Sequence, residues 1–141
     1  MDFIFGGAAA WFENCEICSV DEPGYVTAAS TPEGQRYGYV FHRSRFSSRK
    51  LADDCTYLGR PWRNFAKTVL IDCELGSHIH PDGFHDWGKQ AAHETMLYAE
   101  YGSYGPGAGE KRAAYVQTFP QEKAEGMTFE HFWENTLKEA E

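Results

Sequence analysis

The sequence predicts an all-β protein, a right-handed parallel β-helix of about four coils with a short C-terminal amphipathic helix. The first observation behind this prediction is an internal repeat. The segments 11–17, 40–46 and 69–75 share one pattern and begin at equal intervals along the chain. The second is that turn-forming residues, without a regular helical pattern, lie between the repeats. Repeats of this length, built from short strands and turns, are typical of coils of stacked strands.

The repeated segments alternate apolar and polar positions, as short strands do. Further short strands are expected at residues 3–5, 25–28, 55–58 and 96–99, with turns at residues 21–24, 31–34 and 81–83. Each coil is expected to lie about 4.8 Å from the next, so that equivalent positions form ladders. An antiparallel sandwich with equally spaced hairpins is the alternative fold.

Cys15, Ser44 and Cys73 occupy one position of the repeat and are expected to form an inward ladder. The C-terminal end has a different period, since Phe129, Phe132, Trp133 and Leu137 fall at i, i+3, i+4 and i+8 behind a capping Thr128. We expect this stripe to pack as a helix on the coils and assign it no chemistry.

Composition indicates one domain, residues 1–141, with 42% hydrophobic and 16% aromatic residues to build a core. A formal charge of -8 gives no electrostatic reason to bind nucleic acid or an anionic membrane. It also disfavours an acidic polymer without excluding one, because salt screens long-range repulsion. The chain shows no apolar stretch that would cross a bilayer and no signal peptide.

The metal-ligand residues are few and poorly spaced. The Cys15-x-x-Cys18 pair has no second pair at zinc-module spacing, so we interpret the four cysteines as free, buried thiols. His78, His80 and His85 lie in a turn-rich segment where exposed histidines are common. We therefore predict no metal and no cofactor.

Asp2 and Arg60 are the candidate catalytic residues. Their separation along the chain equals two periods of the repeat, which predicts that they are neighbours in space. An ionised and oriented carboxylate can act as a nucleophile or base, and a long arginine side chain can largely span two coils to orient it. A buried ion pair that only ties coils together explains the spacing equally well.

Trp62 follows Arg60 closely and offers a flat apolar face. Sugar rings stack well on such faces, so an aromatic beside the carboxylate and arginine indicates a carbohydrate groove. Gly102, Gly105, Gly107 and Gly109 lack the context of a phosphate loop, and the sequence contains no Gly-x-Ser-x-Gly elbow.

Four segments together resemble the carboxyl-terminal half of pectin methylesterases, in the same order. They are Asp-Phe-Ile-Phe-Gly at 2–6, Tyr-Leu-Gly-Arg-Pro-Trp at 57–62, His-Pro-Asp-Gly-Phe-His-Asp-Trp at 80–87, and the segment from Tyr-Ala-Glu-Tyr at 98–101 through Gly-Pro-Gly-Ala at 105–108. The resemblance runs over nearly the whole chain. Residues 25–35 look more like the bacterial branch of the family than the plant branch.

This resemblance implies a parallel β-helix that removes methyl esters from the galacturonate units of pectin, without a cofactor. Asp2 matches the nucleophile that forms an acyl-enzyme, and Arg60 matches the arginine that holds it. Trp62 matches an aromatic of the sugar cleft, and Phe84 stands where a tryptophan often lines it. The implied partner is methyl-esterified homogalacturonan, and the implied location of the full-length parent is secreted or periplasmic.

The sequence departs from the family in ways that limit the activity we expect of this chain. A Gln-Asp motif about one coil before the nucleophile supplies the family's general acid and base, and here it would precede Met1. We therefore expect N-terminal coils to be missing, activity to be impaired and the exposed strand edge to self-associate. A non-catalytic pectin-binding module or pseudoenzyme, or a relative with another ester preference, are the alternative functions.

Overall fold

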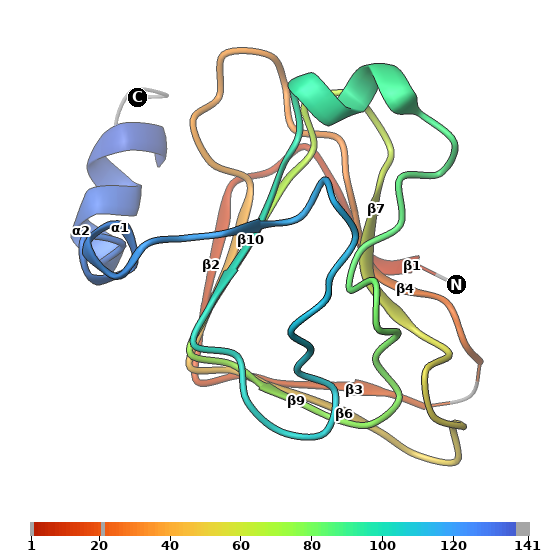
Figure 1. Ribbon diagram of the computed structural model, residues 1–141. Coiled ribbons are helices and arrows are strands. Elements are labelled where there is room, and N and C mark those ends of the chain that lie inside the picture. The colour runs from red at the N-terminus through yellow and green to blue at the C-terminus, as the bar shows by residue number, and fades with distance from the viewer. Residues whose placement is uncertain (1, 21, 138–141) are drawn as a thin grey trace.

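The computed structural model describes residues 2–20 and 22–137 and shows three sheets wound into a solenoid (Figure 1). We call the sheet with the order β1-β4-β7 the first wall, β11-β10-β8-β5-β2 the second wall and β3-β6-β9 the third wall. Every pair of neighbouring strands is parallel. One coil gives one strand to each wall, so the predicted right-handed parallel β-helix is the fold of this chain.

The strands are short and recur in the same order along the chain. The first wall contains β1 (Asp2–Gly6), β4 (Tyr25–Ala29) and β7 (Tyr57–Pro61). The second wall contains β2 (Ala10–Glu13), β5 (Tyr39–His42), β8 (Lys67–Ile71), β10 (Leu97–Tyr101) and β11 (Gln117–Thr118). The third wall contains β3 (Glu16–Ser19), β6 (Arg45–Ser48) and β9 (Glu74–Leu75). The helical segments are η1 (Gln90–Glu94), α1 (Gln121–Glu125), α2 (Phe129–Phe132) and the π-helical turn η2 (Trp133–Leu137).

Three coils are complete, where about four were predicted. The next coil keeps the strand β10 and touches the first and third walls only through isolated bridges at Ile79, Phe84 and Tyr104. Its irregular course follows from residues 78–88, where Pro81 and two glycines with positive φ, Gly83 and Gly88, interrupt strand geometry.

A short corner of constant length joins the second wall to the third in every complete coil. Asn14, Arg43 and Asp72 open these corners with φ of 54°, 54° and 53°. Each predicted repeat segment is therefore not one strand but two, separated by a left-handed residue. The corners also place Cys15 and Ser44 side by side, since the Cys15 amide donates to Ser44 Oγ at 3.2 Å. This contact supports the predicted ladder.

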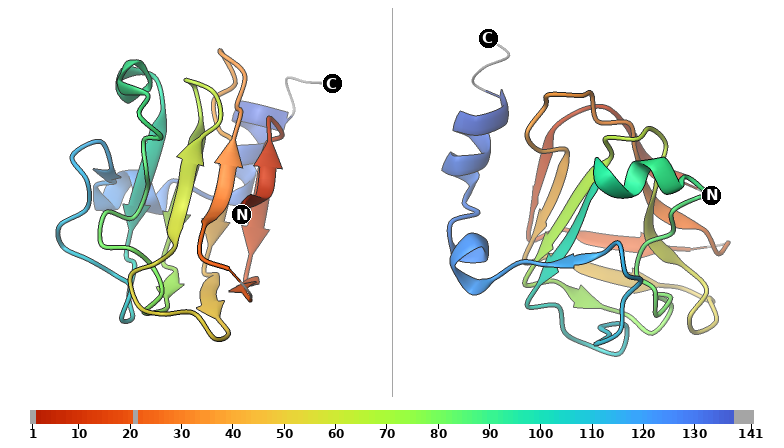
Figure 2. Two further views of the ribbon diagram at one scale, coloured as in Figure 1. Left: turned by 90° about the vertical axis from the view of Figure 1, so that its right-hand side faces the viewer. Right: turned by 45° about the horizontal axis from the view of Figure 1, so that its top comes forward.

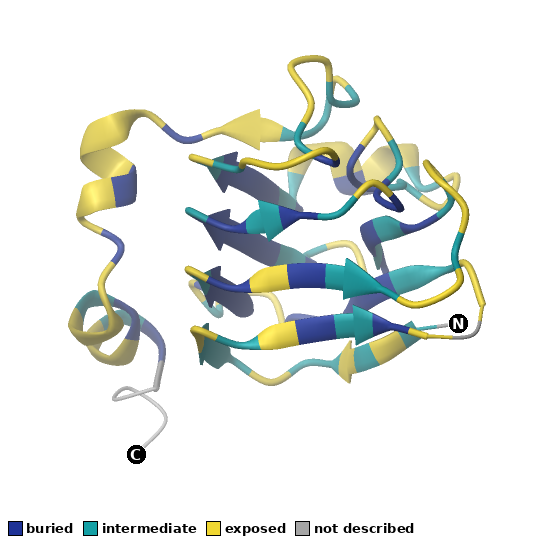
Figure 3. Cartoon of the chain, turned by 90° about the horizontal axis from the view of Figure 1, so that it is seen from below, coloured by how far each residue is buried: buried dark blue, intermediate teal, exposed yellow. Residues whose placement is uncertain are grey.

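The second wall is buried on both faces. Its inner face packs in the main core with Phe41 and Leu70, and its outer face packs under the C-terminal helices with Val40 and Val69. Figure 3 shows these strands largely buried, whereas the helices that cover them are exposed on their far side. Burial on both faces explains why these strands are almost continuously apolar.

The C-terminal stripe forms a helix, but only in part. Thr128 caps α2 as predicted, because its hydroxyl accepts from the His131 amide at 3.2 Å. Phe132 is fully buried under the second wall, while Phe129 and Trp133 are exposed. The side chain of the fourth predicted residue, Leu137, lies outside the described part. Among the described residues, no helix is both long and apolar enough to span a membrane.

The first wall does not follow the period of the repeat. Asp2 pairs with Tyr25, and Tyr25 pairs with Tyr57, so the first step along the chain is shorter than the period and the second is longer. Turns of unequal length on both sides of this wall cause the change, since the other two walls keep the period through the three complete coils. The residue in register with Asp2 two coils on is therefore Tyr57 and not Arg60.

Candidate active site

Asp2 and Arg60 form a two-pronged ion pair on the outer side of the first wall. Arg60 Nη2 donates to Asp2 Oδ2 at 2.8 Å and Arg60 Nε donates to Asp2 Oδ1 at 3.1 Å. The prediction that they are neighbours is confirmed, although by another route. Arg60 lies beyond the position in register with Asp2, and its side chain reaches back across β4. Figure 2, left, turns this wall toward the viewer.

Aromatic rings fix the guanidinium in place. The Arg60 Cζ atom lies 4.2 Å from the centre of the Tyr25 ring and 4.5 Å from the centre of the Trp87 ring. Such contacts favour the cation and orient its planar fork. The hydrogen bond to Asp2 raises the pKa of the Arg60 guanidinium, and burial acts in the opposite direction. Arg60 is thus a fixed positive charge that aims the Asp2 carboxylate.

An open pocket of about 410 Å³ lies directly on this ion pair. Its lining is mostly apolar and aromatic, and it consists of Asp2, Phe5, Ala28, Arg60, Trp62 and Trp87. The Phe5 and Trp62 rings meet edge to face with their centres 6.0 Å apart. A concave apolar surface with a few convergent polar groups is the usual form of a small-molecule site.

Two cations meet behind Trp62. Lys89 Nζ and Arg63 Nη1 both donate to the Trp62 carbonyl oxygen, at 2.8 and 3.0 Å. They fix the backbone that carries the indole, and they place positive charge over the rings of Trp62 and Trp87 at the rim of the pocket. An acidic polymer would meet attraction at this rim despite the net charge of -8.

The structure corrects the prediction for Phe84. This residue was expected to line the groove, but its side chain is completely buried and its ring stacks on Tyr98 at 4.2 Å. The isolated bridge between Phe84 and Gly59 brings it over a residue without a side chain, which leaves room for the ring on the inner side. The exposed aromatic on this loop is Trp87.

Sequence reasoning missed Phe5, Tyr25 and the placement of Trp87 as parts of this site. Phe5 stood in a predicted strand and was given no role, because the register of the first wall is not visible in the repeat. Trp87 was considered only as the last residue of the segment 80–87. No signal in the sequence would have placed Phe5 beside Arg60, because their proximity follows from the observed register, in which both residues pair with Ala28.

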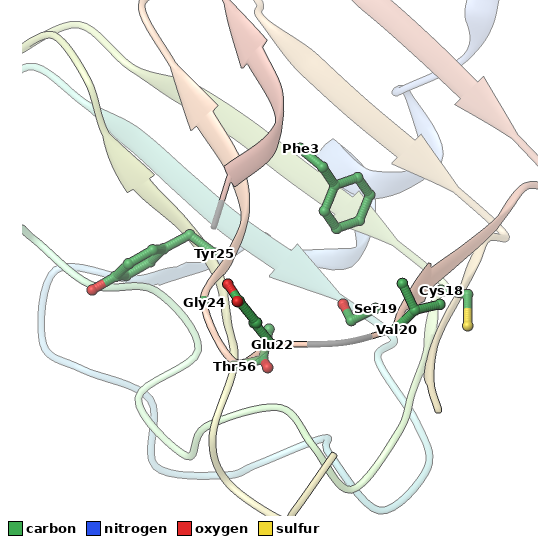
Figure 4. A pocket seen from close by; sticks show the side chains of 8 residues that line it. All are labelled: Phe3, Cys18, Ser19, Val20, Glu22, Gly24, Tyr25 and Thr56. Atoms are coloured by element: carbon green, nitrogen blue, oxygen red, sulfur yellow. The ribbon is translucent and has the colours of Figure 1, made fainter. Parts of the chain in front are cut away.

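A second cavity, of about 320 Å³, lies below Phe3 between the end of β3 and the start of β4 (Figure 4). Its lining is largely apolar, with Cys18, Ser19 and Val20 on one side and Thr56 on another. The Ser19 hydroxyl is buried and makes no hydrogen bond within the described residues. No histidine or lysine stands among the lining residues to activate Ser19 or Cys18, so this cavity offers no nucleophilic centre.

The chemistry of the pocket on the first wall is narrow. Asp2 is the single carboxylate among the described residues that line it, and no histidine lines it. Within residues 2–20 and 22–137, no group of three or more histidine, cysteine, aspartate or glutamate residues is arranged to hold a metal. The pocket therefore presents an oriented carboxylate and an aromatic surface, and among its described lining residues Asp2 is the single candidate for proton transfer.

Comparison with known proteins agrees with this geometry. The family model for pectinesterase matches residues 1–136. A putative pectinesterase/pectinesterase inhibitor from Arabidopsis thaliana is 40% identical over 116 residues, which cover 77% of this chain and 24% of that protein. The structure of the pectin methylesterase from carrot superposes with a TM-score of 0.81 at 29% identity, over 92% of this chain and 45% of that one.

A bacterial structure matches with similar quality. The pectin methylesterase from Yersinia enterocolitica gives a TM-score of 0.76 at 25% identity, over 94% of this chain and 49% of that one. The predicted closeness to the bacterial branch is not confirmed by these values. The chain spans about a quarter of the length of its Arabidopsis relative and less than half of either solved structure.

Proposed function

This chain belongs to the pectinesterase family, and from that premise we propose that it carries the nucleophilic half of an ester-hydrolysing site for methylated pectin. The observation that carries the proposal is the two-pronged contact of Arg60 with Asp2 at the base of an aromatic pocket. A structural ion pair has no need of a pocket. An oriented carboxylate that opens onto a surface suited to sugar rings is what a carbohydrate esterase requires.

In the proposed reaction, an oxygen of the Asp2 carboxylate attacks the carbonyl carbon of the methyl ester. The bond from that carbon to the methoxy oxygen breaks, and methanol leaves with a proton taken from an acid. Water then hydrolyses the resulting anhydride, which restores Asp2 and releases the galacturonate carboxylate. Arg60 aims the Asp2 carboxylate for the attack on the ester, and the sugar ring stacks on Trp62.

The proton for methanol is the weak point of this reaction in the described pocket, because Asp2 is the only carboxylate among its lining residues. General acid assistance is worth about 10² to 10⁴ in rate. We therefore propose that the chain by itself hydrolyses methyl esters slowly. An activated aryl ester, whose phenolate leaves without protonation, should escape this limit.

The test measures methanol release from methylated pectin and phenolate release from a p-nitrophenyl ester. Asp2→Asn keeps the shape of the side chain but removes the nucleophile, so both rates should fall at least about a hundredfold. Asp53→Asn, which changes an exposed carboxylate elsewhere, is the matched control and should leave both rates unchanged. Full activity of Asp2→Asn would exclude Asp2 as the nucleophile.

A non-catalytic pectin-binding module is the second candidate function, favoured by the single carboxylate among the described residues of the pocket. It predicts that polymer binding persists while neither ester is cleaved. Hydrolysis by the unchanged chain separates the candidates, because the module binds methylated pectin and cleaves neither ester, whereas the esterase cleaves both and loses this activity in Asp2→Asn. In either case polymer binding should persist in Asp2→Asn and fall in Trp62→Ala.

We propose further that residues 1–141 fold as one domain, that the parent protein is secreted and that the isolated chain self-associates. The third proposal rests on β1, β2 and β3, which are the outer strands of the three walls, and on the exposure of Phe3 and Phe5. Sedimentation velocity over a tenfold range of concentration tests it. A single monomeric species throughout would contradict it.

A further inference from the structure

The loop of residues 80–89 carries Trp87 to the pocket in a strained backbone conformation. Trp87 has a φ of 53°, in the left-handed region that large side chains seldom adopt. The residue is 45% exposed, yet its ring lies against the Arg60 guanidinium. A strained and partly exposed residue at a site needs a specific restraint to hold it there.

His85 supplies that restraint. The Trp87 backbone amide donates to His85 Nδ1 at 2.9 Å. A ring nitrogen that accepts a hydrogen bond carries no proton, so the imidazole is neutral and its single N–H is on Nε2. When the ring takes up a second proton, Nδ1 becomes a donor that faces another donor. The bond to Trp87 is then lost.

We propose that His85 is a positioning residue whose neutral form holds Trp87 against Arg60 and whose protonation releases it. The inference concerns the placement of Trp87 and stands apart from the reaction proposed above. Only its effect on ester hydrolysis rests on that function. If Trp87 moves away, Arg60 loses one of the two rings that orient it toward Asp2.

The groups packed around His85 do not replace the lost bond. The rings of Tyr57 and Tyr25 lie 5.1 and 6.0 Å from it, on β7 and β4, and support the imidazole in either state. Asp86 is the nearest carboxylate in sequence, but it already accepts from the Gly88 amide at 2.9 Å and contacts His93 of η1 at 2.9 Å. Asp86 also interacts electrostatically with His85. Among the other charged or titratable groups near this cluster, Arg60 packs on Tyr25, His80 stacks on Tyr57, and Lys89 Nζ lies 5.1 Å from the centre of the Trp87 ring. The charge of Asp82 acts on Tyr57 and Tyr115.

The loop contains its own control. His80 Nδ1 accepts from the Asp82 amide at 3.0 Å, which repeats the arrangement of His85 and Trp87 earlier in the same loop. Asn is the matched replacement at both positions, because its side-chain oxygen accepts from the amide two residues on and does not titrate. His85→Asn and His80→Asn therefore keep a bond of the same kind and remove the proton switch from one histidine each.

Amide hydrogen exchange of the whole chain tests the proposal between pH 7.5 and pH 5, with rates corrected for the intrinsic effect of pH. In the unchanged chain, protection of the Trp87 amide should fall about fivefold or more toward pH 5, as expected for loss of one hydrogen bond. His85→Asn should keep the protection within about twofold, and His80→Asn should behave like the unchanged chain. His85→Ala should lower the protection at both pH values.

Constant protection of Trp87 in the unchanged chain would overturn the proposal, as would an equal loss in His85→Asn. Because the first of these outcomes needs no variant, a failure of His85→Asn to fold leaves the test intact. Hydrolysis of the p-nitrophenyl ester adds a separate readout, and the fall in rate toward pH 5 should be smaller in His85→Asn. If no ester is cleaved at all, the proposed function fails while the exchange result still decides the role of His85.

Discussion

The first and second walls of the solenoid are built from equally short strands but differ in what covers them. The second wall is buried on both faces and keeps a constant step along the chain from β2 to β5 and from β5 to β8. The first wall is covered on one face, has one short and one long step, and carries the ion pair of Asp2 and Arg60 on the other face. Regular stacking thus serves packing, and the departure from it opens a surface for chemistry.

This contrast follows from what each wall must satisfy. A wall between two cores needs equivalent apolar residues in every coil, because a polar residue there would be buried without a partner. A wall with one free face needs only its inner residues to repeat. Its outer positions can therefore hold single residues such as Asp2 and Arg60, which have no equivalents in neighbouring coils.

The strongest test of the contrast makes the same substitution in both walls. Phe41→Ala removes a fully buried ring that stacks on Phe12 at 4.5 Å, and it should lower the free energy of unfolding by about 3–5 kcal/mol. Phe5→Ala removes the ring of a first-wall residue that is 63% exposed, and it should cost less than about 1 kcal/mol. Urea unfolding of both variants gives the two values. Equal losses would remove the distinction between the walls.

Arg60→Lys reverses the test, since it should affect function and spare the fold. Lysine keeps the charge but cannot make two parallel hydrogen bonds to Asp2, so ester hydrolysis should fall about a hundredfold. The pair is partly exposed, with 23% and 21% of its side chains accessible, and its loss should change stability by less than about 1 kcal/mol. Assay and urea titration on one preparation measure both. A large loss of stability with normal hydrolysis would mean that the pair only ties coils together.

Gly38→Ala probes how closely the coils approach beside the second wall. An added Cβ would lie 2.5 Å from the Lys67 carbonyl oxygen of the next coil and 2.7 Å from Thr31 Oγ1, so we expect a loss of about 1–3 kcal/mol. Gly126→Ala is the control, because its Cβ would meet only ordinary contacts at the end of α1. That variant should lie within about 0.5 kcal/mol of the parent in thermal unfolding. Similar values for both would argue against tight stacking of coils.

The smallest perturbation needs no substitution. Burial raises the pKa of the Cys73 thiol to about 12, so the thiol stays protonated in the folded chain at pH 8.5 and does not react as a thiolate. The prediction of four buried thiols holds only for Cys73, because Cys15, Cys18 and Cys55 are partly exposed. Iodoacetamide at that pH should therefore modify Cys73 at least about a hundredfold more slowly than the other three. Peptide mass spectrometry follows each site, and concentrated urea should abolish the difference. Because the unfolded thiol ionises at lower pH, stability should also fall as pH rises above about 8.5.

The fold could be predicted from the sequence because the second and third walls must repeat. The stacking of coils is predicted by the repeat at residues 11–17, 40–46 and 69–75. The pattern does not predict that each of these segments turns a corner, at Asn14, Arg43 or Asp72. A left-handed residue has no strong signature when it is an arginine. The C-terminal helix could be predicted for a similar reason. It packs on the regular outer face of the second wall, and its buried side therefore shows a regular spacing of apolar residues.

For the site, the sequence predicted the charged residues but not which aromatic residues surround them. Asp2 and Arg60 were paired correctly from an equality of spacing that the first wall does not obey, because a long side chain bridges the difference in register. Phe84 and Trp87 could not be told apart, because neither the bridge that places Phe84 over Gly59 nor the positive φ of Trp87 has a signature in the sequence. These side-chain orientations are set within an irregular loop, so they cannot be predicted from a periodic sequence pattern.

The constant corner between the second and third walls has a practical consequence for protein engineering. The second and third walls, joined by a corner of the same length in each coil, keep the same geometry in all three complete coils. This geometry does not depend on the lengths of the segments that connect these two walls to the first wall. Those connecting segments differ in length from coil to coil, and the register of the second and third walls stays constant. A reporter peptide or a new binding loop is therefore best inserted at residues 52–54, where the chain is exposed between β6 and β7.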